Sequence, residues 1–362
     1  MAWGLAQISQ GGEGPVPSGR LASCVAGRSV SGRTAMNERT FPVVHSVLDA
    51  SAIRGVVEEE YSLGDGPQCE LVLAGMNDTY RLATNRMRCI VRVYSARWRS
   101  RTEVLYELQL LIHLAEHGMP VSVPIPTRDG ELMLTVRAPE GDRHVVVFTH
   151  VPGHAPEWTN LEHCRRAGQL LARLHSAAED FHGPHLRAPL DVAYLIERPV
   201  AAIKPFLSGR SDDWAYLVGF SERLSARLAA VSDRLDWGVC HGDFSSTGNF
   251  RVGHDGGLTV FDFDLCGPGW RVSDLAPMQR AAVGHKDRRI WRAFLSGYLD
   301  ERHLSSTDLA AVPLFYAACR LWSVGMRASH VARWGALYMG DWYLDWQLRV
   351  IRQWEAAHGC YE

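Results

Sequence analysis

Residues 241–264 read HGDFSSTGNFRVGHDGGLTVFDFD, and this segment says more about the architecture of the chain than any other. Two short segments of it, 250–252 and 258–261, are rich in apolar and β-branched residues and read as strands. The residues between them, 253–257, include Asp-Gly and Gly-Gly pairs, which are typical of tight turns between antiparallel strands. The sequence therefore predicts a β-hairpin here.

Three polar residues gather at the open end of this hairpin. Asn249 and Asp262 lie about equally far from the turn, so strand pairing places them side by side, and Asp243 enters from the preceding loop. A carboxylate can take or orient the proton of a hydroxyl group, while an amide oxygen and a second carboxylate can hold Mg²⁺ on phosphates. The constellation favours phosphoryl transfer to a hydroxyl over a solvated hairpin with incidental acids.

The second strand is expected to continue through two acids. Side-chain alternation then places Val260, Asp262 and Asp264 on one face. Charges at the end of an apolar strand cost free energy unless a cation or a donor compensates them. We therefore expect such a partner beside these carboxylates.

The motifs resemble those of the aminoglycoside phosphotransferase and choline kinase group, which is related to the protein kinases. That family carries His-Gly-Asp, a downstream Asn and an apolar-Asp-apolar strand, as this chain does at 241–243, Asn249 and 261–263. The run FDFDLCGPGWR at 261–271, followed by Asp-Leu-Ala at 274–276, is most similar to the stress response kinase A and type II homoserine kinase branch. The likeness covers residues 41–354.

The resemblance implies an α+β, bilobal, protein-kinase-like fold with a small β-rich N-terminal lobe and a larger, mainly helical C-terminal lobe. It implies that Asp243 is the catalytic base, that Asn249 and Asp262 bind Mg²⁺, and that Asp274 anchors the catalytic loop. One spacing departs from the family. Asn249 lies six residues after Asp243 instead of five, so the loop has one extra residue.

Three segments are expected along the chain. Residues 1–36 are rich in Gly, Ser, Pro and Arg, which predicts a disordered tail or an upstream start. Residues 37–150 are expected to form the nucleotide-binding lobe, with strands near 70–75, 78–82, 89–94, 132–134 and 145–148 and a helix over 102–117. Residues 151–362 are expected to form the catalytic and acceptor-binding lobe, with a capping box at 159–162 and helices near 275–300, 308–330 and 341–357.

The N-terminal lobe contains no lysine, since Lys204 and Lys286 are the only lysines of the chain. Kinases usually pair a strand lysine with a helix glutamate to hold the nucleotide phosphates. Here Arg92 takes the strand position, and Glu107 supplies the acid on the apolar stripe of the expected helix. Arginine presents a fork of donors suited to phosphate oxygens. A purely structural Arg92–Glu107 ion pair is the alternative.

ATP is expected to lie between the lobes. The turn 75–79, with Asn77 and Asp78, is placed to cover the phosphates, because short turns present N–H groups to anions. The adenine is expected against the backbone between Phe148 and Val151.

Composition sets further bounds. The chain has 362 residues, of which 46% are apolar and 22% charged, and a formal net charge of −2, which gives no global attraction to nucleic acid or an anionic membrane. No apolar run is long enough to span a membrane. Eight cysteines without a CxxC pair favour free thiols in a cytoplasmic protein. The oligomeric state stays open.

The leading hypothesis is an ATP- and Mg²⁺-dependent kinase that phosphorylates a hydroxyl of a small molecule, such as an amino alcohol, a homoserine-like compound or an antibiotic. A Ser/Thr protein or peptide kinase of the same fold is one alternative. A catalytically silent nucleotide-binding pseudokinase is another, favoured by the missing lysine and the longer loop. A metal-dependent hydrolase would require more acids or histidines than the motif contains.

Overall fold

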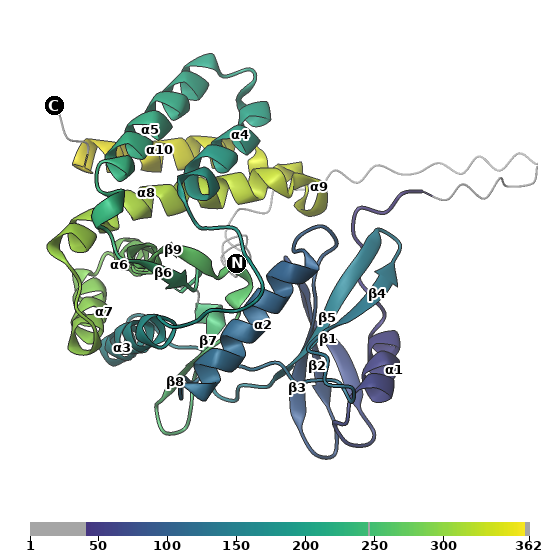
Figure 1. The fold of residues 1–362 in the computed structure, drawn as a ribbon. Coiled ribbons are helices and arrows are strands. Elements are labelled where there is room, and N and C mark those ends of the chain that lie inside the picture. The colour runs from purple at the N-terminus through teal and green to yellow at the C-terminus, as the bar shows by residue number, and fades with distance from the viewer. Residues whose placement is uncertain (1–40, 245–246, 359–362) are drawn as a thin grey trace, which may run out of the picture.

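The fold is that of a computed structural model, which describes residues 41–244 and 247–358. The tail at 1–36 therefore lies outside the described residues. The described chain divides into a small part built on a sheet and a larger helical part (Figure 1).

The N-terminal lobe is a five-stranded antiparallel sheet in the order β1-β2-β3-β5-β4. Two helices cover its opposite faces (Figure 1). Helix α1 packs on one face through Ile53 and Val57, while α2 packs on the other beside Val146 and Phe148. The elements of this lobe are α1 (Ala50–Glu60), β1 (Gln68–Ala74), β2 (Asp78–Ala83), β3 (Arg88–Val93), α2 (Arg101–Glu116), β4 (Leu134–Ala138) and β5 (Gly141–Thr149).

Helix α2 begins and ends close to the expected residues. Ser100 is its N-cap and forms a capping box with Glu103, which satisfies two backbone donors that the first turn leaves free. Gly118, with φ of 74°, follows its C-terminus. The strand expected at 132–134 lies slightly later, at Leu134–Ala138.

The C-terminal lobe is mainly helical and carries two small two-stranded sheets, β6–β9 and β7–β8. Its principal elements are α3 (Leu161–Ala177), α4 (Arg198–Ile203), α5 (Ser211–Ala229), β6 (Trp237–Cys240), β7 (Phe250–Val252), β8 (Leu258–Val260), β9 (Gly267–Trp270), α6 (Ala276–Gly284), α7 (Arg288–Glu301), α8 (Ser306–Ser329), α9 (Val331–Trp334) and α10 (Asp341–His358).

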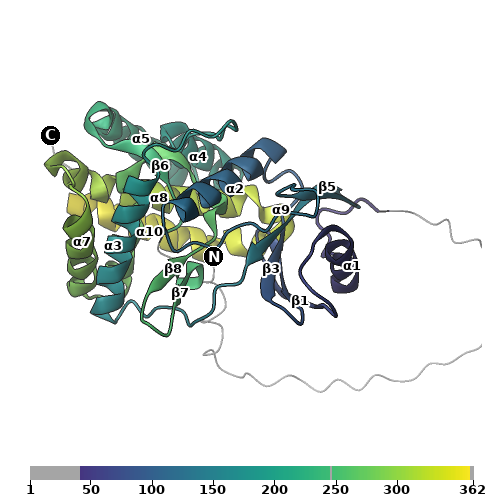
Figure 2. The same cartoon turned by 60° about the horizontal axis from the view of Figure 1, so that its bottom comes forward.

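Helices α3 and α7 approach each other unusually closely (Figure 2). A Cβ atom at Gly168 would overlap the carbonyl oxygen of Phe294, and one at Gly297 would overlap that of Arg165. Both positions therefore require glycine, despite its cost inside a helix.

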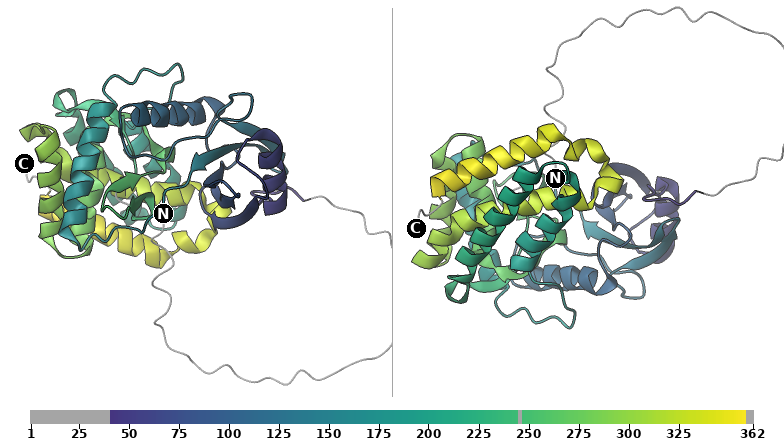
Figure 3. Two further views of the ribbon diagram at one scale, coloured as in Figure 1. Left: turned by 90° about the horizontal axis from the view of Figure 1, so that it is seen from below. Right: turned by 90° about the horizontal axis from the view of Figure 1, so that it is seen from above.

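Helix α8 is the central helix of this lobe, and α10 runs along it (Figure 3). It is the one helix of the described chain that is long and apolar enough to cross a membrane. More than half of its most apolar window, 56%, is buried within the fold, as in a core helix. It packs against α4, α5, α6 and α10.

Two expected boundaries are wrong. The N-cap of α3 is Asn160, whose side chain accepts from the N–H of Glu162, so no capping box starts at Thr159. The helix expected over 275–300 is two helices, because the chain turns at Lys286, which has a φ of 54°. A backbone in this left-handed region cannot continue an α-helix.

Candidate active site

The hairpin forms as expected at its closed end. Strands β7 and β8 pair with Phe250 opposite Val260, and the N–H of Phe261 donates to the carbonyl oxygen of Asn249 at 3.0 Å. The N–H of Val260 also donates to the carbonyl of Pro120 at 3.0 Å, which joins the hairpin to the segment that follows α2. The open end of the hairpin therefore lies at the boundary between the lobes.

The strand does not continue through both acids. It ends at Val260, and Asp262 adopts left-handed backbone angles, φ 68° and ψ 61°. A short 3₁₀ turn, Phe263–Leu265, follows. The expectation that Asp262 and Asp264 share one strand face is therefore wrong, because a left-handed residue breaks the two-residue alternation.

Asp243 and Asn249 are in direct contact. The Asn249 Nδ2 group donates to Asp243 Oδ2 at 3.0 Å and to the Asp243 carbonyl oxygen at 3.1 Å. Burial raises the pKa of Asp243, and the negative charge of Asp262 raises it further. The three residues singled out in the sequence therefore lie together, despite the extra loop residue before Asn249.

This arrangement suits a divalent cation. Because the amide nitrogen of Asn249 is committed to Asp243, its Oδ1 atom is left as an oxygen ligand. The Asp262 side chain is 42% exposed, so its carboxylate is accessible. Amide and carboxylate oxygens are the ligands that Mg²⁺ prefers.

Asp274 fastens the loop that carries the candidate base. Its carboxylate accepts from the backbone N–H groups of His241 at 2.6 Å and Gly242 at 2.8 Å. It also contacts His175 Nε2 at 3.2 Å. Burial opposes the charge of Asp274, but these hydrogen bonds lower its pKa overall. His241 is itself buried against Phe263, so its ring packs within the fold.

Arg92 bridges two carboxylates. Its Nη1 atom lies 2.9 Å from Glu107 Oε1, and its Nη2 atom lies 2.9 Å from Asp262 Oδ1. Glu107 is fully buried and also accepts from the Tyr94 hydroxyl at 2.9 Å. Burial raises the pKa of Glu107 to about 7, although Arg92 opposes the shift. The guanidinium therefore connects α2 of the N-terminal lobe to Asp262 of the C-terminal lobe.

Asp264 lies in the same cluster of contacts between the lobes, although the sequence predicted no role for it. Its Oδ2 atom accepts from Asn77 Nδ2 at 2.9 Å and from Trp98 Nε1 at 2.7 Å. Arg99 donates to its carbonyl oxygen at 2.7 Å, and Arg187 donates to the same oxygen. The second acid of Phe-Asp-Phe-Asp was the only local signal for this second link between the lobes.

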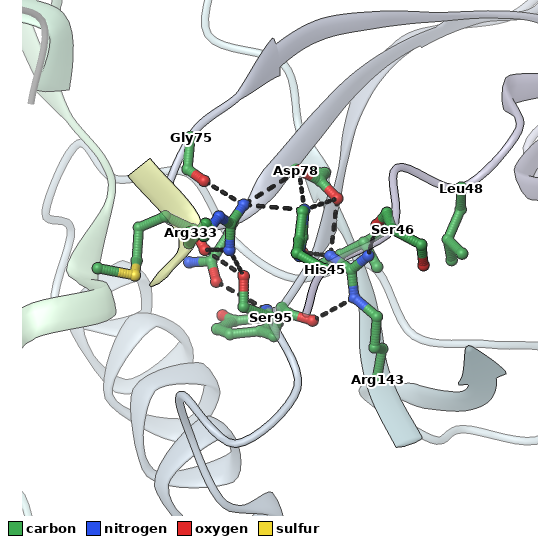
Figure 4. Close-up of polar contacts among 12 residues, drawn as sticks. His45, Ser46, Leu48, Gly75, Asp78, Ser95, Arg143 and Arg333 are labelled. Atoms are coloured by element: carbon green, nitrogen blue, oxygen red, sulfur yellow. Dashed lines mark hydrogen bonds and ion pairs between the residues drawn. The ribbon is translucent and has the colours of Figure 1, made fainter. Parts of the chain in front are cut away.

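The side chain of Asp78 forms ion pairs within the protein and does not face a ligand-accessible surface, since it is buried. Its buried carboxylate lies 2.8 Å from Arg143 Nη2 and 3.2 Å from His45 Nε2 (Figure 4). The Asn77 side chain is likewise committed, through Asp264 and the backbone N–H of Ser95. Any nucleotide contact at this turn therefore falls to its backbone and not to these two side chains.

Arg333 ties the same turn to the C-terminal lobe. It extends from α9 and donates to the carbonyl oxygens of Met76, at 2.8 Å, and of Gly75 (Figure 4). It also donates to the Ser95 hydroxyl and lies 3.4 Å from Asp78 Oδ1. No sequence pattern pointed to Arg333, because its partners are more than two hundred residues away.

The expected adenine segment lies at the end of β5. Phe148 is buried, and its backbone lies between Ile90 of β3 and Pro124. The Arg92 Cζ atom lies 5.1 Å from the centre of its ring. Val151 follows the strand and is half-buried. The Phe148 ring therefore packs against Arg92. The adenine contact predicted for this segment would have to come from the backbone of the residues that follow Phe148.

Seven aromatic or polar residues that could contact an acceptor are scattered over the C-terminal lobe, where the acceptor is expected to bind. Two are tryptophans packed on aromatic rings: Trp270 contacts Phe315 and Trp322 lies beside Tyr194. Two form ion pairs, Arg271 with Asp236 and Asp341 with Arg210. Arg327 lies over the Tyr343 ring, Arg320 lies over the Trp346 ring, and His285 is exposed. Three of these residues are arginines. Arg271 pairs with Asp236, whereas Arg320 and Arg327 have no carboxylate partner within the described part of the chain.

Replacement of Asp274 by Asn is expected to destabilise the fold by about 2–4 kcal/mol at neutral pH, because one amide oxygen cannot replace two acceptors. The lowered folded-state pKa stabilises the protein above the unfolded pKa, and this contribution is lost as the pH falls through the folded value. Urea unfolding at neutral and at acid pH should therefore show that the difference in free energy of unfolding between the unmodified protein and Asp274→Asn becomes smaller in acid. The exposed Asp142→Asn serves as control. An equal loss of unfolding free energy at neutral and at acid pH would contradict the conclusion that charged Asp274 stabilises the fold.

Replacement of Arg333 by Met is expected to release the turn at 75–77. Loss of charge-assisted hydrogen bonds worth about 1.5–3 kcal/mol should speed amide hydrogen exchange in that turn by roughly 10–100-fold. Exchange read by mass spectrometry would test this, with the exposed Arg349→Met as the control. Unchanged protection at 75–77 would show that the contacts do not hold the turn.

Comparisons with known proteins identify the family and the fold of the chain. A profile of the phosphotransferase enzyme family matches residues 71–312. An uncharacterised protein of Deinococcus radiodurans is 38% identical over 327 residues, covering 89% of this chain and 94% of that protein. A homoserine kinase of Phenylobacterium zucineum is 30% identical over 273 residues, covering 72% of this chain and 80% of the kinase.

Solved structures show the same fold. A microcompartment-associated aminopropanol kinase superposes with a TM-score of 0.71 at 23% identity, covering 85% of this chain and 98% of that chain. An amicoumacin kinase superposes with a TM-score of 0.68 at 18% identity, covering 86% of this chain and 94% of the kinase chain. The expected bilobal kinase-like fold is confirmed. With two thirds of its length matched by the family profile, the chain belongs to the phosphotransferase enzyme family.

Proposed function

We propose that this protein is an ATP- and Mg²⁺-dependent kinase that transfers the γ-phosphoryl group to a hydroxyl of a small molecule. The observation that carries the proposal is the contact of Asp243 with Asn249, beside Asp262, at the boundary between two lobes. The aminopropanol and amicoumacin kinases of the same fold act on small molecules, which supports this acceptor class.

The proposed roles follow from the contacts. The Asp243 carboxylate orients the acceptor hydroxyl and takes its proton, and its raised pKa makes it a better base than an ordinary aspartate. Asn249 and Asp262 would hold Mg²⁺, which would neutralise charge on the phosphates. Arg92 would reach the phosphates from between Glu107 and Asp262, and the backbone at 75–77 would cover them.

Two alternatives remain within the same fold. A Ser/Thr peptide kinase would use the same base and metal ligands with a different acceptor. A silent nucleotide-binding protein is favoured by the absence of a lysine in the N-terminal lobe, yet the contact of Asn249 with Asp243 survives the longer loop. A panel of hydroxyl compounds and peptides, read by ADP release, separates the three.

A cytoplasmic location also belongs to the proposal, since the six described cysteines are free thiols.

Replacement of Asp243 by Asn is expected to lower kcat by roughly 10²–10⁴-fold, the usual contribution of a general base. ATP binding, followed by thermal shift with and without Mg²⁺, should be retained because the base does not hold the nucleotide. Asp255→Asn, in the hairpin turn, is the matched control. Retained turnover in Asp243→Asn would reject the base assignment, and absence of ADP from the unmodified protein would favour the silent binder.

Replacement of Arg92 by Ala tests whether this residue serves the phosphates or only the fold. We expect ATP affinity to fall by roughly 10–100-fold, because a charge-assisted contact worth about 1.5–3 kcal/mol is lost. Isothermal titration at matched folded fraction gives the affinity, and Arg92→Lys shows whether a point charge suffices. Unchanged affinity in Arg92→Ala would support the structural ion pair.

A further inference from the structure

Two histidines and an aspartate gather where the C-terminal end of α2 lies against the end of α3. His113 and His117 are about one helical turn apart, and the centres of their rings are 4.2 Å apart. Asp180 follows α3 and reaches both rings, with Oδ1 3.2 Å from His113 Nε2 and Oδ2 3.7 Å from His117 Nε2. One ligand atom from each of the three residues lies within 4.8 Å of the other two. The three side chains therefore converge on one point.

The spacing of these atoms matches a tetrahedral metal site. With bonds of about 2.0–2.1 Å to nitrogen and oxygen, two ligands of a tetrahedral ion lie roughly 3.3 Å apart. The two histidine–aspartate distances, 3.2 and 3.7 Å, lie on either side of that value. The carbonyl oxygen of Ala177, 2.8 Å from His113 Nε2, stands beside them as a further oxygen. Two imidazoles and a carboxylate, with one more oxygen, form a ligand set of the kind that Zn²⁺ takes.

His117 makes the second hydrogen bond that is expected of a metal ligand. Its Nδ1 atom lies 2.8 Å from the carbonyl oxygen of His113. Because a carbonyl oxygen only accepts, Nδ1 carries a proton, and a neutral His117 presents the lone pair of Nε2 on the side of Asp180. Histidines that bind metals almost always donate their other N–H group in this way, which fixes the tautomer and the orientation of the ring.

The contacts of Asp180 require a positive charge. The lone pair of His117 Nε2 and the Oδ2 atom of Asp180 are both acceptors, and they face each other at 3.7 Å. The single proton that His113 Nε2 can carry likewise meets two acceptors, the Ala177 carbonyl oxygen and Asp180 Oδ1. Among the described residues, no arginine or lysine pairs with Asp180. A proton on His117 or a metal ion can supply the charge, and only the metal ion contacts all three side chains at once.

The surrounding fold holds this cluster in place and leaves it open to solvent. The half-buried His113 ring packs against Phe181, with ring centres 5.3 Å apart, and Phe181 in turn packs edge-on against Tyr106 at 5.3 Å. His117 and Asp180 are exposed, so an ion can enter from solution. Within the described ranges, no hydrogen bond or ion pair links the cluster to the hairpin that carries the candidate catalytic residues.

We propose that His113, His117 and Asp180 bind a divalent transition-metal ion, Zn²⁺ by the type of ligand, which joins α2 of the N-terminal lobe to the end of α3 in the C-terminal lobe. Imidazole suits zinc, copper and nickel ions, whereas Mg²⁺ prefers sites made of oxygen atoms. The site therefore differs in chemistry from the Mg²⁺ site proposed at Asn249 and Asp262, and it does not depend on the proposed function. The bound ion would restrain the same helix that carries Glu107.

The test is the binding of Zn²⁺ to the full-length protein, measured by isothermal titration in a buffer with excess Mg²⁺ to occupy sites made of oxygen atoms. His117→Ala and Asp180→Ala each remove one exposed ligand and are expected to weaken Zn²⁺ binding by roughly 100-fold or more, because loss of even an outer partner of a metal ligand costs about 10–100-fold. The exposed His303→Ala is the matched control and should bind Zn²⁺ as the unmodified protein does. Circular dichroism checks that each variant is folded.

Amide hydrogen exchange, read by mass spectrometry, locates the bound ion. At concentrations well above its Kd, Zn²⁺ should slow exchange at the C-terminal end of α2 and over residues 178–181 by roughly 10-fold or more, and this protection should be absent in His117→Ala. Absence of Zn²⁺ binding in the presence of Mg²⁺ would overturn the proposal and leave a protonated His117 as the charge that faces Asp180. Binding that both substitutions leave unchanged, or protection confined to other segments, would also overturn it.

Discussion

The contact of Arg92 with two carboxylates from different lobes is the interaction on which the site depends. Glu107 is fully buried, and a buried carboxylate is tolerable only beside a cation or several donors. Arg92 meets that requirement and reaches Asp262 with its second nitrogen. Because one rigid, planar group serves both acids, the position of α2 is coupled to that of the candidate metal ligand.

Two further contacts constrain the same boundary. Asn77 is bound to Asp264, and Arg333 is bound to the carbonyls of the turn that contains Asn77. The turn is therefore held by one residue of the hairpin end and by one residue of a C-terminal helix. The Asn77 side chain and the carbonyl oxygens of Gly75 and Met76 hold the turn in place.

Local chemistry predicted much of this arrangement. The hairpin, the placement of Asn249 near Asp243, and the burial of Glu107 all followed from turn residues and apolar spacing, because these signals act over a few positions. The roles of Asn77 and Asp78 were less accessible. Their partners, Asp264 and Arg143, lie 187 and 65 residues away, and no local pattern encodes such pairs.

Arginine in place of lysine has a physical consequence for the N-terminal lobe. A lysine ammonium is a point charge on a flexible stem, whereas the guanidinium presents donors in a fixed plane. In Arg92 that plane is supported by the Phe148 ring at 5.1 Å and by Glu107 at 2.9 Å. The fork is thus oriented before any ligand binds, so the phosphate contact that we propose for Arg92 would cost less conformational entropy.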